Sequence, residues 1–253
     1  MKRKLIARVK HMKVTILKSI MAVTTASIAF SGFATQASAV GLTPNQEGEV
    51  NVGVEVEGAE YLSNDLFPFI ESIVSEVDDT TGAKSRLFID SFSTSNTYAG
   101  GVQLGTKDAG TNHQGYWFRP SEYVNGTSEE NGQLEVGTFT FNFNTVFEDL
   151  TINWFDTEFN NSTGVTAING VALENPNWVA KGSDSNIFTQ TFSNIESITL
   201  KLGKDTVNGT GDGVNFQLLG NPAPKSVPEP ASLGGLAIVG LALAGRRKLQ
   251  NRR

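Results

Sequence analysis

The sequence predicts an all-β fold: a single jelly-roll-like β-sandwich with at most one short helix, placed between two terminal targeting segments. Between residues 40 and 220, apolar and polar residues alternate with a period of two in most segments, which is the pattern of strands with one buried face. The connecting segments are rich in Gly, Asn, Ser, Thr and Asp, which favour tight turns. Many short strands separated by such turns favour a β-sandwich.

Residues 1–39 have the parts of a secretory signal peptide. A basic segment precedes an uncharged stretch at 20–33, and the small residues Ala37 to Ala39 follow as a cleavage site. We predict cleavage after Ala39, with the Sec translocon and signal peptidase as partners. Either Met1 or Met12 fits as the start. The alternative is an uncleaved anchor, but the apolar run is shorter than the ~20 residues that a membrane span prefers.

The strongest alternation lies at residues 50–56, where four valines are separated by polar residues or glycine. Further strands are predicted at residues 86–91, 101–104, 137–144, 150–155, 197–202 and 214–218. Asn-Gly pairs tolerate the positive φ of tight turns. We therefore predict turns at Asn125-Gly126, Asn131-Gly132, Asn169-Gly170 and Asn208-Gly209.

One helix is predicted over residues 65–77. The stripe of Phe69, Ile70, Ile73, Val74 and Val77 has the spacing of one helical face, and an asparagine directly before residue 65 is suited to cap the first turn. The moderate length indicates a helix that packs against the sheet.

Residues 221–230 contain four prolines and are predicted to form an extended linker. The linker ends in the motif Val227-Pro228-Glu229-Pro230. An uncharged run at 231–245 follows; as a helix it is about 22 Å long, somewhat short for a bilayer core of ~30 Å. The predicted cytoplasmic tail at 246–253 carries the basic residues Arg246, Arg247, Lys248, Arg252 and Arg253, which halt translocation by the positive-inside rule.

The order of motif, apolar helix and basic tail resembles the PEP-CTERM sorting signal, which exosortase recognises. The resemblance implies export, transient anchoring in the inner membrane by the C-terminal helix, and then release to the cell surface or the extracellular space. The alternative is a simple single-span anchor in which the Pro-Glu-Pro sequence is incidental.

The charge of the predicted extracellular domain is strongly acidic. Residues 40–225 carry 8 basic and 25 acidic side chains, a net charge of −17. This charge disfavours nucleic acid as a partner, because a polyanion is repelled, and it favours divalent cations. The chain has no cysteine, so neither a disulfide framework nor a thiolate site is expected.

Acidic residues near the predicted turns are candidate calcium ligands, because carboxylate and carbonyl oxygens suit Ca²⁺. They are Asp149, Asp156, Glu158, Asp205 and Asp212. Their spacing matches no EF-hand loop, and solvated surface acids remain the simpler interpretation of each. No other cofactor is expected.

Tyr116, Trp117 and Trp154 are candidate saccharide contacts, since exposed aromatic rings stack on sugars. Core packing explains the same residues more simply, because Trp154 continues an alternating strand. For catalysis, a serine triad would have to use His113, the one histidine after the signal peptide, and no nucleophile-elbow motif lies near it. We assign no catalytic residue.

The middle of the chain has a resemblance of its own, carried by YWFRPS at 116–121, GQLEVGTFTFNF at 132–143, NWFDTE at 153–158 and GDGVNFQL at 211–218. Together these segments resemble the subgroup of PEP-CTERM proteins named for the sequence Leu-Glu-Val-Gly, here Leu134 to Gly137. The resemblance implies a surface or matrix role and supplies no catalytic residues.

We therefore expect a non-enzymatic surface or extracellular-matrix protein associated with exopolysaccharide or biofilm. The first alternative is a saccharide-binding module, with or without a stabilising calcium ion. The second is a secreted polysaccharide-active enzyme.

Overall fold

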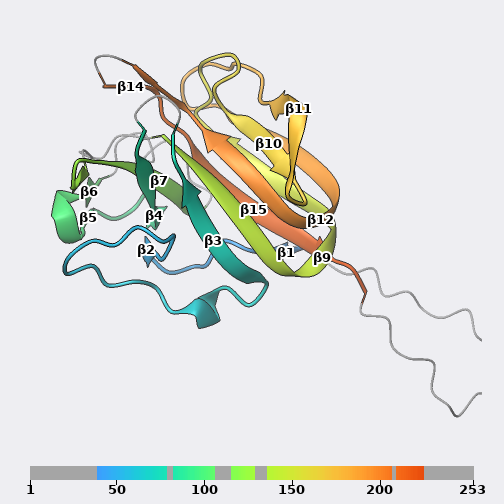
Figure 1. The fold of residues 1–253 in the computed structure, drawn as a ribbon, viewed down its shortest axis with the longest axis horizontal. Coiled ribbons are helices and arrows are strands. Elements are labelled where there is room, and N and C mark those ends of the chain that lie inside the picture. Colours follow the sequence, from blue (N-terminus) through green and yellow to red (C-terminus); the bar gives the residue numbers. More distant parts are fainter. Residues whose placement is uncertain (1–38, 79–81, 106–114, 129–135, 207–208, 225–253) are drawn as a thin grey trace, which may run out of the picture. The chain divides into compact units, whose positions relative to one another are not determined.

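A computed structural model describes residues 39–78, 82–105, 115–128, 136–206 and 209–224 (Figure 1). The predicted all-β class is confirmed, because the described residues form fifteen strands and only two short 3-10 helices. In this part of the chain no helix is both long and apolar enough for a membrane span. Most of the predicted signal peptide, the sorting helix and the basic tail lie outside the described residues.

The strands, in chain order, are β1 (Val40–Gly41), β2 (Gly48–Val50), β3 (Ile70–Glu76), β4 (Lys84–Ser91), β5 (Asn96–Thr97), β6 (Gln103–Leu104), β7 (Tyr116–Val124), β8 (Thr127–Ser128), β9 (Gly137–Phe155), β10 (Gly164–Ile168), β11 (Val171–Trp178), β12 (Ile187–Leu202), β13 (Lys204–Thr206), β14 (Gly209–Asp212) and β15 (Asn215–Pro222). The 3-10 helices are η1 (Asn64–Leu66) and η2 (Ala99–Gly101).

Eleven strands form one sheet with the order β11-β10-β12-β9-β15-β7-β4-β2. In addition, β1 pairs with β15, β3 with β9, and β8 with β7. Two small hairpins, β5–β6 and β13–β14, complete the described strands (Figure 1).

The long strand β9 makes the sheet bend. Most of its 19 residues pair with β12 along one edge. Along the other edge, residues 138–143 pair with β3 and residues 147–155 pair with β15. Because two strands share that edge, the halves of β9 belong to different parts of the sheet. The register of β12 shifts opposite this junction, between Ile195 and Ser197.

Aromatic side chains join the two parts of the sheet. Trp154, Phe216, Phe118 and Ile89 are cross-strand neighbours in successive strands, so they share one face. Phe141, in the first half of β9, packs against this row, with ring centroids 5.5 Å from Phe118 and 5.7 Å from Phe216. All five residues are fully buried. The core therefore lies between the β15 part and the β3 part of the bent sheet.

The predicted helix at 65–77 is wrong: its second half is strand β3. The register of β3 shifts between Ile70 and Ser72, so two residues of β3 face one residue of β9. This bulge turns both Ile70 and Ile73 into the core, while Val74 and Val77 are exposed. An i, i+3 apolar spacing normally indicates a helix, and here a β-bulge produces the same spacing.

The valine alternation at 50–56 correctly predicted buried side chains, but it predicted a longer strand than the structure has. Val50, Val52 and Val54 are buried, yet β2 ends at Val50. Gly53, with φ of +75°, breaks the extended backbone. The apolar period therefore continues through a loop that packs on the sheet.

Two of the predicted Asn-Gly turns are confirmed as two-residue hairpins. Asn125 and Gly126 join β7 to β8 with φ of 53° and 81°, and Asn169 and Gly170 join β10 to β11 with φ of 51° and 73°. Asn131-Gly132 and Asn208 lie outside the described residues.

The strands predicted at 137–144 and 150–155 are one continuous strand, β9. Strand β15 continues to Pro222, two residues into the segment expected as linker. The next residue, Ala223, donates its N–H to the Val146 carbonyl at 2.8 Å. The folded domain thus extends closer to the sorting motif than the proline content indicated.

Candidate functional site

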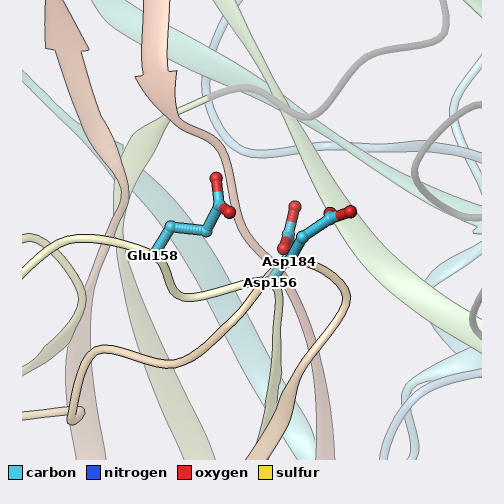
Figure 2. A group of neighbouring side chains, drawn as sticks. All are labelled: Asp156, Glu158 and Asp184. Atoms are coloured by element: carbon cyan, nitrogen blue, oxygen red, sulfur yellow. The ribbon is translucent and has the colours of Figure 1, made fainter.

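Three carboxylates meet where β9 ends and β12 begins. Asp156 and Glu158 directly follow β9, and Asp184 lies three residues before β12. Because Phe155 pairs with Ile187 in the antiparallel ladder, the loops at this end of the two strands are neighbours. One carboxylate oxygen from each residue lies within 4.8 Å of those of the other two (Figure 2).

Hydrogen bonds between the two loops hold this arrangement. Asn186 donates its side-chain N–H to the Thr157 carbonyl at 2.9 Å, and its side-chain oxygen accepts from the Thr157 hydroxyl at 2.9 Å. The Asp156 N–H donates to the Asn186 carbonyl at 2.9 Å. Thr157 is fully buried. The loop that carries two of the carboxylates is thus joined to the loop that carries the third.

The backbone also directs the carboxylates. Asp156 has a φ of 65°, in the left-handed region that Asp adopts more readily than most residues. One of its carboxylate oxygens accepts the Ser185 N–H at 2.7 Å. Asp156 and Glu158 are half-buried and Asp184 is exposed. Ca²⁺ binds six to eight oxygen atoms from carboxylates, carbonyls and water, so this group has the donor chemistry for that ion.

The structure brings together only part of the predicted calcium set. Asp149 lies within β9, roughly 20 Å along the strand from Asp156, and its carboxylate accepts the Ser193 hydroxyl at 2.9 Å. The side chains of Asp205 and Asp212 lie outside the described part of the structure. Sequence reasoning missed Asp184, since only the pairing of β9 with β12 shows that it lies near Asp156.

The two tryptophans considered as saccharide contacts are buried, so that assignment is corrected. Trp154 is fully buried on the core face of β9, and its indole N–H donates to the Gln190 side-chain oxygen at 3.1 Å. Trp117 is 3% exposed and packs against Phe155 with ring centroids 5.8 Å apart. Tyr116 is half-buried. Neither tryptophan offers an open face to a sugar.

The remaining predicted site residues lie at the ends of the described chain or outside it. Ala39 is exposed and directly precedes β1. Ala37, His113, the Val227–Pro230 motif and the basic tail lie outside the described residues.

A second polar region lies on the face of β4 and β7 opposite the core, and sequence reasoning missed it. Arg86 bonds both carboxylate oxygens of Glu49, at 2.8 and 2.6 Å. Arg119 bonds Asp90 at 2.8 Å. The four side chains are 0–2% exposed. Burial raises the pKa of Asp90 above its ordinary value, although the charge of Arg119 opposes the shift.

Comparison with known proteins identifies the C-terminal segment. Residues 226–248 match the family described as the PEP-CTERM protein-sorting motif, which confirms the predicted sorting motif. The matched segment spans Val227–Pro230 and the first three basic residues after the apolar run. No curated protein and no solved structure matches the chain. Exosortase processes proteins that carry this motif. The match therefore indicates an exported surface protein that is anchored through its C-terminus before it reaches the surface.

Proposed function

We propose that the protein is a non-catalytic component of the cell surface or extracellular matrix, processed by exosortase at its C-terminus and associated with exopolysaccharide. The observation that carries the proposal is the match of residues 226–248 to the sorting motif. The excess of acidic over basic side chains between residues 40 and 225 supports a soluble domain that repels anionic membrane surfaces.

The position of the chain ends supports the same proposal. Val40 pairs with Gly220 in the ladder of β1 and β15, so the residues that follow the predicted signal cleavage site lie beside the last strand before the sorting motif. A domain closed in this way can remain folded while membrane segments on both sides are removed.

The C-terminus of the native protein tests this proposal. We expect mass spectrometry of protein from the cell surface to show a chain that ends near Pro230, and an exosortase deletion to restore the tail. The variant Pro228→Ala with Pro230→Ala should also retain the tail, whereas Pro224→Ala, a proline outside the motif, should not. A wild-type surface protein that ends at Arg253 contradicts the proposal.

The absence of catalysis and the finer classification are also parts of the proposal. We assign the chain to the Leu-Glu-Val-Gly subgroup on Leu134 to Gly137, and its fold to the jelly-roll-like β-sandwiches. Hydrolysis of the host's own exopolysaccharide by the purified protein, abolished by a single carboxylate substitution, would establish the enzyme alternative instead.

A calcium-stabilised domain is the second candidate, and the carboxylate group of Asp156, Glu158 and Asp184 favours it. Bound calcium would offset the repulsion between three neighbouring carboxylates and would join the loop after β9 to the loop before β12. Calcium should then raise the thermal midpoint of the wild type and not that of Asp184→Asn.

A further inference from the structure

A polar hollow of about 500 Å³ lies between β2, the loop of residues 58–63 and residues 97–99. This volume falls within the range of small-molecule sites. The lining combines two tyrosines, three glutamates and hydroxyl-bearing side chains. It contains none of the carboxylates of Figure 2 and none of the aromatic residues that the sequence suggested as saccharide contacts.

The walls of the hollow are fixed to its floor. The Leu62 N–H donates to the Glu49 carbonyl at 2.7 Å, which holds one wall on β2. Gly48 permits this approach, because a Cβ there would lie 2.6 Å from the Leu62 side chain. Arg86 bonds the Glu49 carboxylate and also the Ala99 carbonyl, at 2.7 Å, in the opposite wall. The hollow is therefore preformed, which lowers the entropic cost of binding.

Two tyrosines supply an aromatic surface and a hydrogen-bond donor. Tyr61 is 36% exposed, and its hydroxyl donates to the Val54 carbonyl at 2.9 Å, which fixes the ring. Tyr98 packs on Phe88 with ring centroids 4.7 Å apart. Burial, followed by the charges of Asp90, Glu47 and Glu49, raises the pKa of Tyr98. Its hydroxyl therefore stays protonated, and it has no hydrogen-bond partner among the described residues.

The glutamates supply acceptors and a negative charge. One carboxylate oxygen of Glu47 accepts the Ser91 N–H and the Thr94 hydroxyl, which leaves its second oxygen available. Glu60 is exposed and forms no hydrogen bond within the described residues. Only Glu49 has a cationic partner there, Arg86. The hollow is therefore negatively charged and repels anions.

We propose that this hollow binds a saccharide that carries no carboxylate or sulfate group, with Tyr61 as the stacking surface and Glu47, Glu60 and Tyr98 as hydrogen-bond partners. Vicinal hydroxyl groups match paired acceptors and a phenol donor, and an exposed ring matches the apolar face of a sugar. A metal ion fits less well, because the glutamates of the hollow do not form a convergent group of ligands among the described residues. The inference rests on the proposed function in one respect: the matrix location supplies the saccharide.

Titration calorimetry on the full chain in mild detergent tests the site. The probes are neutral hexose oligomers, glucosamine oligomers and uronate oligomers of equal length. We expect saturable binding of at least one neutral or amine-bearing oligomer and none of the uronates. Tyr61→Leu should weaken binding by about tenfold, as the loss of a stacking ring predicts. Glu60→Gln should also weaken it and reduce the exclusion of uronates.

Matched variants separate binding from folding. Tyr61→Phe loses the hydrogen bond that fixes the ring but keeps the ring itself, so it should weaken binding less than Tyr61→Leu does; a merely structural role for Tyr61 would make both substitutions equally harmful. Phe159→Ala removes an exposed ring outside the hollow and should have no effect.

Binding of none of the probes, equal binding of uronates, or binding that Tyr61→Leu leaves unchanged overturns the inference. A correctly processed C-terminus without saccharide binding contradicts the inference about the hollow and leaves the proposed sorting intact. Saccharide binding by a chain that keeps its C-terminal tail contradicts the proposed sorting and leaves the inference about the hollow intact.

Discussion

Arg86 and Glu49 form a two-bond ion pair inside the protein, with their side chains 0% and 2% exposed. Arg86 lies on β4 and Glu49 on the neighbouring strand β2. The guanidinium also bonds the Ala99 carbonyl and the Ser128 hydroxyl, and it lies 4.9 Å above the centroid of the Phe88 ring. Segments from four parts of the chain thus depend on one buried cation.

Removing one partner of this pair should destabilise the fold strongly, because the other charge is then buried alone. We expect Glu49→Gln or Arg86→Met to lower the free energy of unfolding by about 3–5 kcal/mol, measured by urea denaturation. Arg86→Lys should also be harmful, since an ammonium group cannot reproduce the two-bond geometry. The double variant Glu49→Leu/Arg86→Met should be more stable than the Arg86→Met single variant. If Glu49→Gln is as stable as the wild type, the ion pair does not stabilise the fold.

Asp90 should give the protein a distinct pH dependence. Its pKa in the folded protein is raised above the ordinary value of 3.8, mainly by burial. The folded state therefore holds the proton more tightly than the unfolded state does. The contribution of Asp90 to stability is fully present below pH 3.8 and is lost as the pH rises through the folded pKa.

Comparison with Asp90→Asn, which cannot ionise, measures this contribution. The stability of the wild type relative to Asp90→Asn should decrease as the pH rises from about 3 towards neutrality, by urea denaturation at each pH. The exposed Asp65→Asn serves as the control for a change of charge alone. A relative stability that increases with pH would mean that the attraction of Arg119 exceeds the effect of burial.

The predictable parts of this structure are those in which local pattern and tertiary contact agree. The alternation around Trp154 predicted its burial because β9 is regular there, and Asn169-Gly170 predicted a hairpin because both residues adopt positive φ. The spacing of Ile70 and Ile73 wrongly predicted a helix, because a β-bulge in the pairing of β3 with β9 changes which residues face the core.

The candidate sites were harder to predict because they depend on contacts between distant segments. Asp184 joins Asp156 only through the ladder of β9 and β12. Likewise, Glu49 and Arg86 are 37 residues apart and meet because β2 pairs with β4. No local spacing encodes either relationship.

The pairing of β1 with β15, which brings the first and last strands of the domain together, depends on Gly220. A Cβ at this position would lie 2.3 Å from the Phe147 ring, and Gly220 is also the partner of Val40 in β1. We expect Gly220→Val to destabilise the fold by about 1–3 kcal/mol through overpacking. It should also speed hydrogen exchange at the Leu42 N–H, which donates to the Leu218 carbonyl at 2.8 Å. Gly41→Val is the matched control, because no atom lies within 4 Å of a Cβ there; equal effects of the two variants would refute this account.

The calcium response should depend on the contact between the two loops as well as on the carboxylates. The Asn186 side chain forms three hydrogen bonds with Thr157 and carries no charge. Asn186→Ala therefore leaves all three carboxylates in the chain and removes these side-chain contacts between the two loops, while the backbone bond from the Asp156 N–H to the Asn186 carbonyl remains. Ligands that must first be ordered bind more weakly. We therefore expect Asn186→Ala to reduce the rise in thermal midpoint between chelator and millimolar calcium, measured by scanning calorimetry. Asn175→Ala, at an exposed position of β11, should keep the full rise. If calcium does not raise the thermal midpoint of the wild type, the three carboxylates are only solvated surface acids. If calcium raises the midpoint of Asn186→Ala as much as that of the wild type, the side-chain contact between the loops is not needed to bind the ion.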